Sequence, residues 1–183
     1  MKVKVTPSKV HGNVKIPASK SMAHRALICA SLSDGTSIVS NVTNSKDIEA
    51  TVGCMKALGA KIKQIDETTY EVTGTNLFKQ EGNITCNANE SGSTLRFLIP
   101  LAACTNAKVK FLGQGRLLQR PMDVYKNEFK EQNIEFNQSD KEIIVRGNLQ
   151  AKDYVVQGDI SSQFITGFMF VLPLLNQDST LTI

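Results

Sequence analysis

Four residues able to bind anions stand where an expected strand becomes an expected helix, in IPASKSMAHRALICASL (residues 16–32): Ser19, Lys20, Ser21 and Arg25. The first turn of a helix has unpaired N–H groups and the positive end of the helix dipole, so it attracts anions. Serine caps such a helix, lysine adds a point charge, and arginine adds a planar fork that fits a carboxylate or phosphate. The pattern favours a small-anion site, with a capped helix and solvated side chains as the alternative.

Two further expected helices begin in the same way, at SGST (residues 91–94) and at SSQ (residues 161–163), and the first of them carries Arg96 soon after its start. Three such starts in one chain indicate several helix N-termini facing one cavity. Three ordinary serine caps are the alternative.

A glycine-containing loop, GQGRLLQRPM (residues 113–122), carries Arg116 and Arg120. Glycine lets the backbone approach a ligand closely, and the two arginines suit phosphate or carboxylate, unless they are only solvated. Neither G-x-x-x-x-G-K-[ST] nor a G-x-G-x-x-G that opens a helix is present, which disfavours a nucleotide-binding fold.

The elements that must position these residues recur in the order β-α-β-α-β-β at a period of roughly 70 residues. We expect two full units, at residues 13–80 and 83–149, and a partial third at 153–183. The expected strands are 13–18, 35–42, 61–66, 69–74, 83–88, 107–113, 134–138, 142–147, 153–158 and 179–183, and the expected helices are 21–32, 45–60, 91–104, 121–133 and 161–175.

The expected fold is α+β, with the repeated units arranged around a pseudo-threefold axis, the helices buried and the sheets outside. Three helical stretches support this arrangement because they are nearly apolar all round: ALICASL, LRFLIPLAA and FITGFMFVLPLL.

Composition limits the classes of function. The chain has 183 residues, 41% of them hydrophobic, and a net charge of +4, so one or two globular domains are expected. Only 6% of residues are aromatic and the basic residues are dispersed, which argues against nucleic-acid binding.

The cysteines and histidines bear on the cellular compartment and on metal binding. Cys29, Cys54, Cys86 and Cys104 are expected to be reduced thiols of a cytoplasmic protein, three of them in the core. His11 and His24 alone make a zinc site improbable, and we expect neither a metal nor a cofactor. No stretch resembles a signal peptide or approaches the roughly 20 apolar residues of a membrane span.

Four motifs follow one another over the whole chain: IPASKSMAHRAL, NESGSTLRFL, GRLLQRPM and GDISSQF. By these motifs and their order, the chain resembles the 3-phosphoshikimate 1-carboxyvinyltransferase (EPSP synthase) family. The related UDP-N-acetylglucosamine 1-carboxyvinyltransferases share the architecture but typically have Lys-Asn where this chain has Lys20-Ser21, so they are the alternative.

The resemblance implies a reaction of the shikimate pathway, in the biosynthesis of chorismate and the aromatic amino acids. The 5-hydroxyl of shikimate 3-phosphate attacks C2 of phosphoenolpyruvate while C3 takes a proton, and the tetrahedral intermediate then loses phosphate. Both substrates are anions, so fixed donors in a dry cleft would offset their repulsion and orient them.

The resemblance also implies roles for individual residues. Ser21 and Arg25 would bind the shikimate carboxylate, and Lys20 would contact phosphoenolpyruvate and the reacting hydroxyl as the catalytic residue of this chain. Three residues would complete the shikimate 3-phosphate site, with Gln163 also touching phosphoenolpyruvate: Ser161, Ser162 and Gln163. Gly92 and Arg120 would bind phosphoenolpyruvate, with supporting roles for Arg96 and Arg116.

Two departures from the family pattern qualify these expectations. Glu90 stands where the family commonly has an amide near a phosphate, so we expect its carboxylate to pair with a cation or turn away. The family has two similar domains, and this chain supplies most of one. We therefore expect residues 1–14 to form a strand belonging to the other domain, and residues 15–183 to form the N-terminal domain.

In the family, the acid–base carboxylate and several cations that hold phosphoenolpyruvate lie in the C-terminal half. The chain alone is therefore expected to be an inactive fragment that needs that half as a partner. An anion-binding module without catalytic activity is the alternative from another class.

Overall fold

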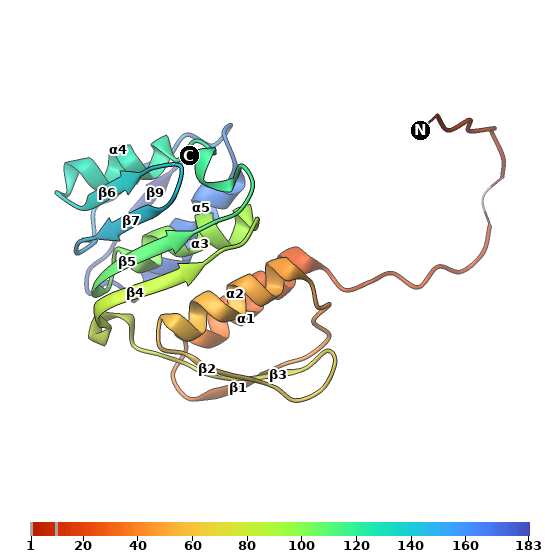
Figure 1. Cartoon of the computed structure of the whole chain (residues 1–183), viewed down its shortest axis with the longest axis horizontal. Helices are drawn as coiled ribbons and strands as arrows, with labels where there is room; N and C mark the ends of the chain where they lie inside the picture. The colour runs from red at the N-terminus through yellow and green to blue at the C-terminus, as the bar shows by residue number, and fades with distance from the viewer. Residues whose placement is uncertain (1, 10) are drawn as a thin grey trace.

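Three separate sheets surround a group of helices in the computed structural model, which describes residues 2–9 and 11–183 (Figure 1). No single continuous parallel sheet joins the described strands. The arrangement is therefore the mixed α+β fold that the sequence predicts.

The first sheet, in the order β1-β3-β2, is antiparallel throughout. Gly59, at a φ of 101°, follows the end of α2, so this helix ends a few residues before the end of the expected helix 45–60. The elements of this part of the chain are α1 (Lys20–Leu32), β1 (Thr36–Val39), α2 (Lys46–Ala57), β2 (Lys61–Gln64) and β3 (Tyr70–Thr73).

The second sheet, in the order β4-β5-β7-β6, pairs β4 with β5 in parallel and its other strands antiparallel. Pro121, expected in the first turn of α4, lies just before that helix, whose cap is Met122. The elements here are η1 (Leu77–Lys79), β4 (Glu81–Asn87), α3 (Gly92–Ala102), β5 (Asn106–Leu112), η2 (Leu117–Gln119), α4 (Asp123–Glu131), β6 (Glu135–Gln138) and β7 (Ile143–Arg146).

The third sheet has two parallel strands, β8 (Asp153–Val155) and β9 (Thr180–Thr182). Between them the chain forms α5 (Ser162–Val171) and the short helix η3 (Leu172–Leu174). The parallel pairing requires this crossover, because adjacent parallel strands cannot be joined by a tight hairpin.

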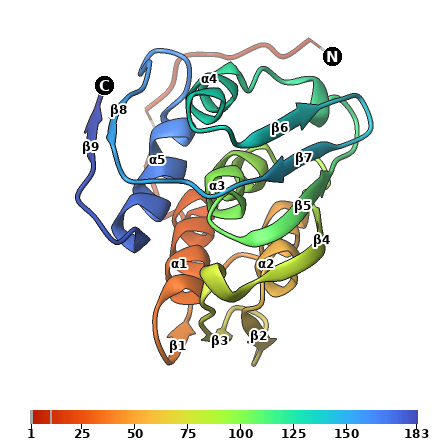
Figure 2. The same ribbon diagram turned by 90° about the vertical axis from the view of Figure 1, so that its left-hand side faces the viewer.

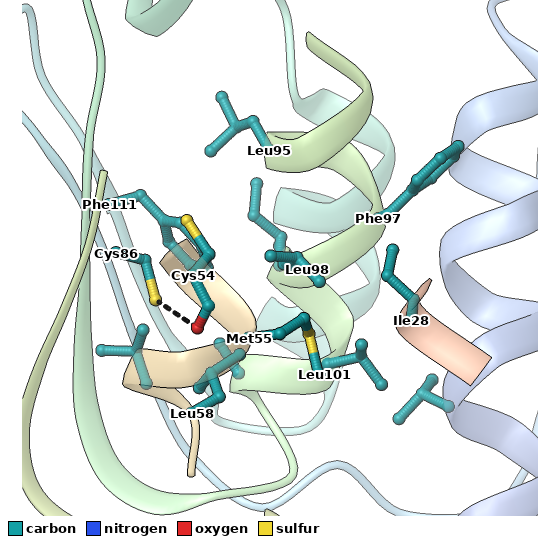
Figure 3. Close-up of a cluster of buried hydrophobic side chains, with 14 of the residues drawn as sticks. Ile28, Cys54, Met55, Leu58, Cys86, Leu95, Phe97, Leu98, Leu101 and Phe111 are labelled. Carbon is teal, nitrogen blue, oxygen red and sulfur yellow. Dashed lines mark hydrogen bonds between the residues drawn. The ribbon is translucent and has the colours of Figure 1, made fainter. Parts of the chain in front are cut away.

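The core centres on α3, which lies among α1, α2 and α5 with the sheets outside (Figure 2). Leu95, Leu98 and Leu101 of α3 are fully buried, and residues of α1 and α2 pack against them (Figure 3). The thiol of Cys86 donates to the carbonyl of Cys54 across 3.8 Å. The predicted free core thiols are thus confirmed at three positions, while Cys29 is exposed.

The prediction that the apolar helix α5 is buried on all its faces is wrong. Phe164, Phe168 and Val171 are buried, whereas Met169 is 62% exposed. The helix packs one face against α3, and none of the described elements covers Met169. An apolar composition alone therefore overestimates how many faces of this helix are packed.

The strand expected at residues 13–18 is absent from this structure. Residues 11–19 belong to no strand or helix, and Val14 and Ile16 are more than four-fifths exposed. The neighbouring sheet edge, β1, has β3 on one side and no described strand on the other. An extended segment without a partner strand gains no sheet hydrogen bonds, which is why the apolar pattern misleads here.

Residues 2–9 are likewise exposed, and they pair with none of the described strands. Figure 1 shows this part of the chain leading away from the helices and sheets. Met1 and Val10, which belong to the strand expected at residues 1–14, lie outside the described residues.

Candidate functional site

The first turn of α1 carries its predicted cap and an ion pair that was not predicted. The Ser19 hydroxyl accepts a hydrogen bond from the Met22 N–H at 3.3 Å. Lys20 Nζ lies 2.7 Å from Asp47 Oδ2 in the first turn of α2. About half of the Lys20 side chain is exposed, and such pairs are worth roughly 0–1 kcal/mol. An incoming anion can therefore compete with Asp47 for Lys20.

Arg25 links α1 to α5. Its guanidinium donates to the Ser21 carbonyl at 3.0 Å and to the Thr166 hydroxyl at 3.2 Å, and it lies 5.3 Å from the centre of the Phe97 ring. Within the described part of the chain, no carboxylate pairs with it. The contacts hold the side chain in place without neutralising its charge, which suits an anion receptor.

Arg96 and Gln163 connect α3 to α5. The Arg96 guanidinium donates to the side-chain oxygen Oε1 of Gln163 at 2.7 Å, and Gln163 Nε2 donates to the Ser93 hydroxyl at 2.8 Å. The Tyr125 hydroxyl donates to the Arg96 carbonyl at 2.6 Å and holds the helix backbone. Gln163 is thereby hydrogen-bonded to two residues of α3 that lie 67 and 70 positions before it in the sequence.

Two arginines converge over Gly92. A Cβ atom at Gly92 would collide with the Arg120 guanidinium and would lie 3.3 Å from Arg96 Nη1. Burial lowers the pKa of Arg96, and the nearby charge of Arg120 lowers it further, partly offset by Tyr125. No acid of the described residues pairs with either arginine. Two like charges that meet over Gly92 without a neutralising acid suit the binding of an anion.

The loop before α4 holds Arg120 by its backbone. The Arg120 N–H donates to the Leu117 carbonyl at 3.2 Å, and the Gln138 side chain donates to the carbonyls of Leu118 and Arg120 at 2.6 and 2.9 Å. Arg116 in the same loop is exposed, and its side chain forms no ion pair with the described residues. Of the two arginines in this loop, Arg120 is the one whose guanidinium lies over Gly92.

The start of α5 has its expected serine cap. The Ser161 hydroxyl accepts from the Gln163 N–H at 3.3 Å, and the Ser162 carbonyl accepts from the Thr166 hydroxyl at 3.0 Å. Ser162 is exposed and Ser161 is half-buried. Through Gln163 and Thr166, both serines are close to the arginines of α1 and α3.

Lys20 opens onto a cavity of about 550 Å³ that carries both signs of charge. Glu90 lies on its wall, with one carboxylate oxygen 2.6 Å from the position of a Cβ at Gly115. Glu90 forms no ion pair with the described residues, so the first of the two outcomes expected for it, pairing with a cation, does not occur. The cavity is lined by Lys20, Ser45, Lys46, Asp47, Glu49, Asn89, Glu90 and Gln114.

A buried polar chain below these residues was missed by the sequence reading. His24 Nδ1 lies 2.7 Å from the Thr51 hydroxyl, which lies 2.7 Å from that of Thr94. Thr94 donates to the Ser91 hydroxyl at 2.7 Å, and Ser91 caps α3 by accepting from the Thr94 N–H. The available signal was His24 on the apolar side of α1, which we considered only as a metal ligand.

Burial keeps His24 neutral. The loss of hydration lowers its pKa from 6.5 to about 4, although Asp47 raises it, and the charges of Lys20 and Arg25 add to the lowering. Across the described ranges, no group of three or more histidine, cysteine or acidic residues is arranged to hold a metal ion. None of the helices described has the length and apolar character of a membrane span.

Comparison with known proteins gives a consistent assignment. The family model of EPSP synthase (3-phosphoshikimate 1-carboxyvinyltransferase) matches residues 4–183. The 3-phosphoshikimate 1-carboxyvinyltransferase of Clostridium perfringens strain SM101 is 47% identical over the whole chain, and that of Clostridium kluyveri is 46% identical over 99% of it. The chain spans 43% and 42% of the length of these two relatives.

The fold has a counterpart among solved structures. The EPSP synthase of Acinetobacter baumannii superposes with a TM-score of 0.78 over 93% of this chain and 40% of its own, at 18% sequence identity. That likeness bears on the fold alone, whereas the family match covers nearly every residue. The chain therefore belongs to the EPSP synthase family.

Proposed function

We propose that this chain forms one wall of the active site of a carboxyvinyltransferase that converts phosphoenolpyruvate and shikimate 3-phosphate into 5-enolpyruvylshikimate 3-phosphate and phosphate. Family membership supports the reaction class. The single observation that carries the proposal is the convergence of Arg96 and Arg120 over Gly92, without a carboxylate to neutralise them. A bound phosphate or carboxylate would supply the missing negative charge.

Shikimate 3-phosphate would lie across α1 and α5. Arg25 and Ser21 would take its carboxylate, and Ser161 and Ser162 its phosphate. The contact between Arg25 and Thr166 supports this placement, because it brings the two helix starts together. Holding both ends of the ligand would orient its 5-hydroxyl toward phosphoenolpyruvate.

Phosphoenolpyruvate would lie beside Gly92, with Arg120 and Arg96 as charge partners and Gln163 between the two substrates. The hydrogen bonds of Gln163 to Ser93 and Arg96 support that intermediate position. Lys20 would exchange Asp47 for the reacting groups when substrate binds, and would stabilise negative charge as C2 becomes tetrahedral. Arg116, which is exposed, would have at most a supporting part.

The remaining catalytic groups would come from a part of the enzyme outside this chain, since the relatives are more than twice as long. We infer that the acid–base carboxylate and the facing cations lie there, and that this chain corresponds to the N-terminal domain. Four free thiols, two of which adjoin at Cys54 and Cys86, support a cytoplasmic location.

We also infer that the domain is built from βαβαββ units related by a pseudo-threefold axis. The order of the elements supports this, because strand and helix types recur in the same sequence around α3. The two parallel pairs, β4 with β5 and β8 with β9, each enclose a helix with a serine cap.

Calorimetric titration tests the proposal. The chain should bind shikimate 3-phosphate and should not bind UDP-N-acetylglucosamine, which distinguishes the two enzyme classes. Inorganic phosphate should bind weakly, and Arg120→Ala should weaken its binding about tenfold, as expected for the loss of a charge-assisted hydrogen bond.

Arg116→Ala is the matched control, since it removes an exposed arginine of the same loop that forms no ion pair with the described residues. It should leave the dissociation constant unchanged. Equal losses in the two variants would contradict the assignment of the site to Gly92 and Arg120, because general charge attraction would then explain the binding.

A further inference from the structure

The hydrogen bond from Thr94 to Ser91 sets the direction of the other hydrogen bonds in the buried polar chain. The hydroxyl of Thr94 donates to Ser91 at 2.7 Å, with the Asp47 carbonyl also within reach at 3.3 Å. A hydroxyl has one proton, so Thr94 has none left for Thr51. Thr51 must therefore donate to Thr94 across their 2.7 Å contact.

The Thr51 hydroxyl also has a single proton to donate. Its only proton goes to Thr94, so its oxygen must accept from His24 Nδ1, 2.7 Å away. His24 is 2% exposed and neutral, so only one of its ring nitrogens carries a proton. That proton must lie on Nδ1, whose contact with Thr51 selects the tautomer.

We propose that His24 is a positioning residue of the active site, whose Nδ1–H is the first donor of a one-way chain through Thr51 and Thr94 that fixes the Ser91 cap and thereby the first turn of α3. The inference rests on the proposed function only for what that turn would bind.

This series of hydrogen bonds ends at Ser91, next to the residues proposed to bind anions. Ser91 is followed by Gly92, over which the two arginines converge, and by Ser93, which accepts from Gln163. Thr94 also reaches the carbonyl of Asp47, whose carboxylate holds Lys20. His24 thus lies behind three separate contacts of the site without reaching any of them itself.

The fixed polarity has a structural consequence. A Ser91 oxygen that receives both the Thr94 N–H and the Thr94 hydroxyl is held in the capping geometry. Without the His24 donor, Thr51 is free to point its proton elsewhere, and Thr94 can then turn toward the Asp47 carbonyl. The cap would lose one of its two hydrogen bonds, and the peptide of Gly92 and Ser93 would move.

Nitrogen NMR of the histidine rings tests the tautomer directly in this chain. His24 should be neutral at pH 7 with its proton on Nδ1, whereas exposed His11 serves as the internal reference. A proton found on Nε2 of His24 would overturn the proposal, since Thr51 would then have to donate to the ring.

Substitutions test the consequence for the site. His24→Asn keeps a donor at the position of Nδ1, and His24→Leu removes it; likewise Thr51→Ser keeps the hydroxyl and Thr51→Val removes it. His24→Leu and Thr51→Val should shift the amide signals of Gly92 and Ser93 and weaken the binding of shikimate 3-phosphate about tenfold, the equivalent of one hydrogen bond. His24→Asn and Thr51→Ser should keep both readouts as in the unaltered chain.

Val52→Ala is the packing control, because Val52 is buried on α2 beside Thr51 and has no polar group. It should lower the melting temperature without moving the Gly92 and Ser93 amides. If His24→Asn changed the amide signals and the binding as much as His24→Leu does, the donor would be irrelevant and the proposal wrong.

The proposed function and the positioning role of His24 can be contradicted independently. If the unaltered chain does not bind shikimate 3-phosphate, the proposed function is contradicted. The tautomer of His24 and the amide signals of Gly92 and Ser93, which need no ligand, still decide the positioning role.

Discussion

At the scale of single residues, Arg25 tests the placement of shikimate 3-phosphate. Its guanidinium is held by Ser21 and Thr166 but is not neutralised by the described residues. Arg25→Ala should weaken calorimetric binding of the ligand ten- to a hundredfold, since charge-assisted bonds contribute roughly 1.5–3 kcal/mol. Arg25→Lys keeps the charge but not the fork and should recover only part of the loss. An unchanged dissociation constant in Arg25→Ala would remove the basis for the assignment.

Gly92 tests the convergence of the arginines. An alanine methyl group would occupy the space of the Arg120 guanidinium, which is the flexible end of its side chain and can move away. Gly92→Ala should therefore fold normally while losing most affinity for inorganic phosphate in calorimetry. Gly53→Ala, on α2 with open space around its Cβ position, should stabilise the chain by about 0.5–1 kcal/mol and leave binding intact. Undiminished phosphate affinity in Gly92→Ala would contradict the site.

His24 predicts a pH dependence of stability. Burial lowers its pKa from 6.5 to about 4, so between these values the unfolded chain binds more protons than the folded one. The free energy of unfolding should therefore fall as the pH drops from 6.5 toward 4, by at most about 3 kcal/mol from this residue.

Urea unfolding at pH 7 and pH 4.5 measures the effect. His24→Asn should lose much less stability over this interval than the unaltered chain, whereas His11→Asn, at an exposed position, should behave as the unaltered chain does. Equal losses with and without His24 would show that carboxylates alone cause the dependence.

The residue scale also shows where sequence reasoning stops. Gly92, Arg120 and Arg25 stand out because their types and spacing suit anions. Asp47 and Thr51 do not, because they meet Lys20 and His24 across 27 positions, through the packing of α1 against α2. Contacts of this kind follow from the tertiary structure and leave no local pattern.

At the scale of elements, periodicity predicts the helices well. Ile48, Val52, Met55 and Leu58 lie on one face of the expected helix 45–60, and all four are buried in the structure. The hairpins β2–β3 and β6–β7 form where the strands were expected, at residues 61–66 with 69–74 and at 134–138 with 142–147. Local pattern suffices in these cases because each element carries its own face or turn signal.

Residues 13–18 show the limit of the same method. Their apolar alternation is typical of a strand, but a strand also needs a neighbour, and none of the described strands pairs with them. Ile16→Thr should therefore change the stability of this chain by less than about 0.5 kcal/mol, as exposed positions do. Ile62→Thr, at a buried site in β2, should destabilise it strongly in thermal unfolding. Equal destabilisation would mean that Ile16 packs against the domain.

At the scale of the whole molecule, the three sheets hold the helix starts in place while the sheets themselves carry no part of the anion site. The site draws on α1, α2, α3 and α5 and on the loop before α4, which are far apart in the sequence. The chain spans less than half the length of its relatives. Under the proposed function, its donors form one wall of the active site. A wall of this kind can bind and orient an anion, but it cannot exclude water or transfer the proton that the reaction requires.

Phosphate release from shikimate 3-phosphate and phosphoenolpyruvate is the measurement that tests this account most directly. It should be made with the chain alone and with the remaining part of the Clostridium perfringens relative added in trans. We expect no turnover by the chain alone, even though it binds shikimate 3-phosphate, and measurable release when the two parts are combined. Turnover by the chain alone at the rate of the full-length relative would contradict the account, because the catalytic groups would then all lie within these 183 residues.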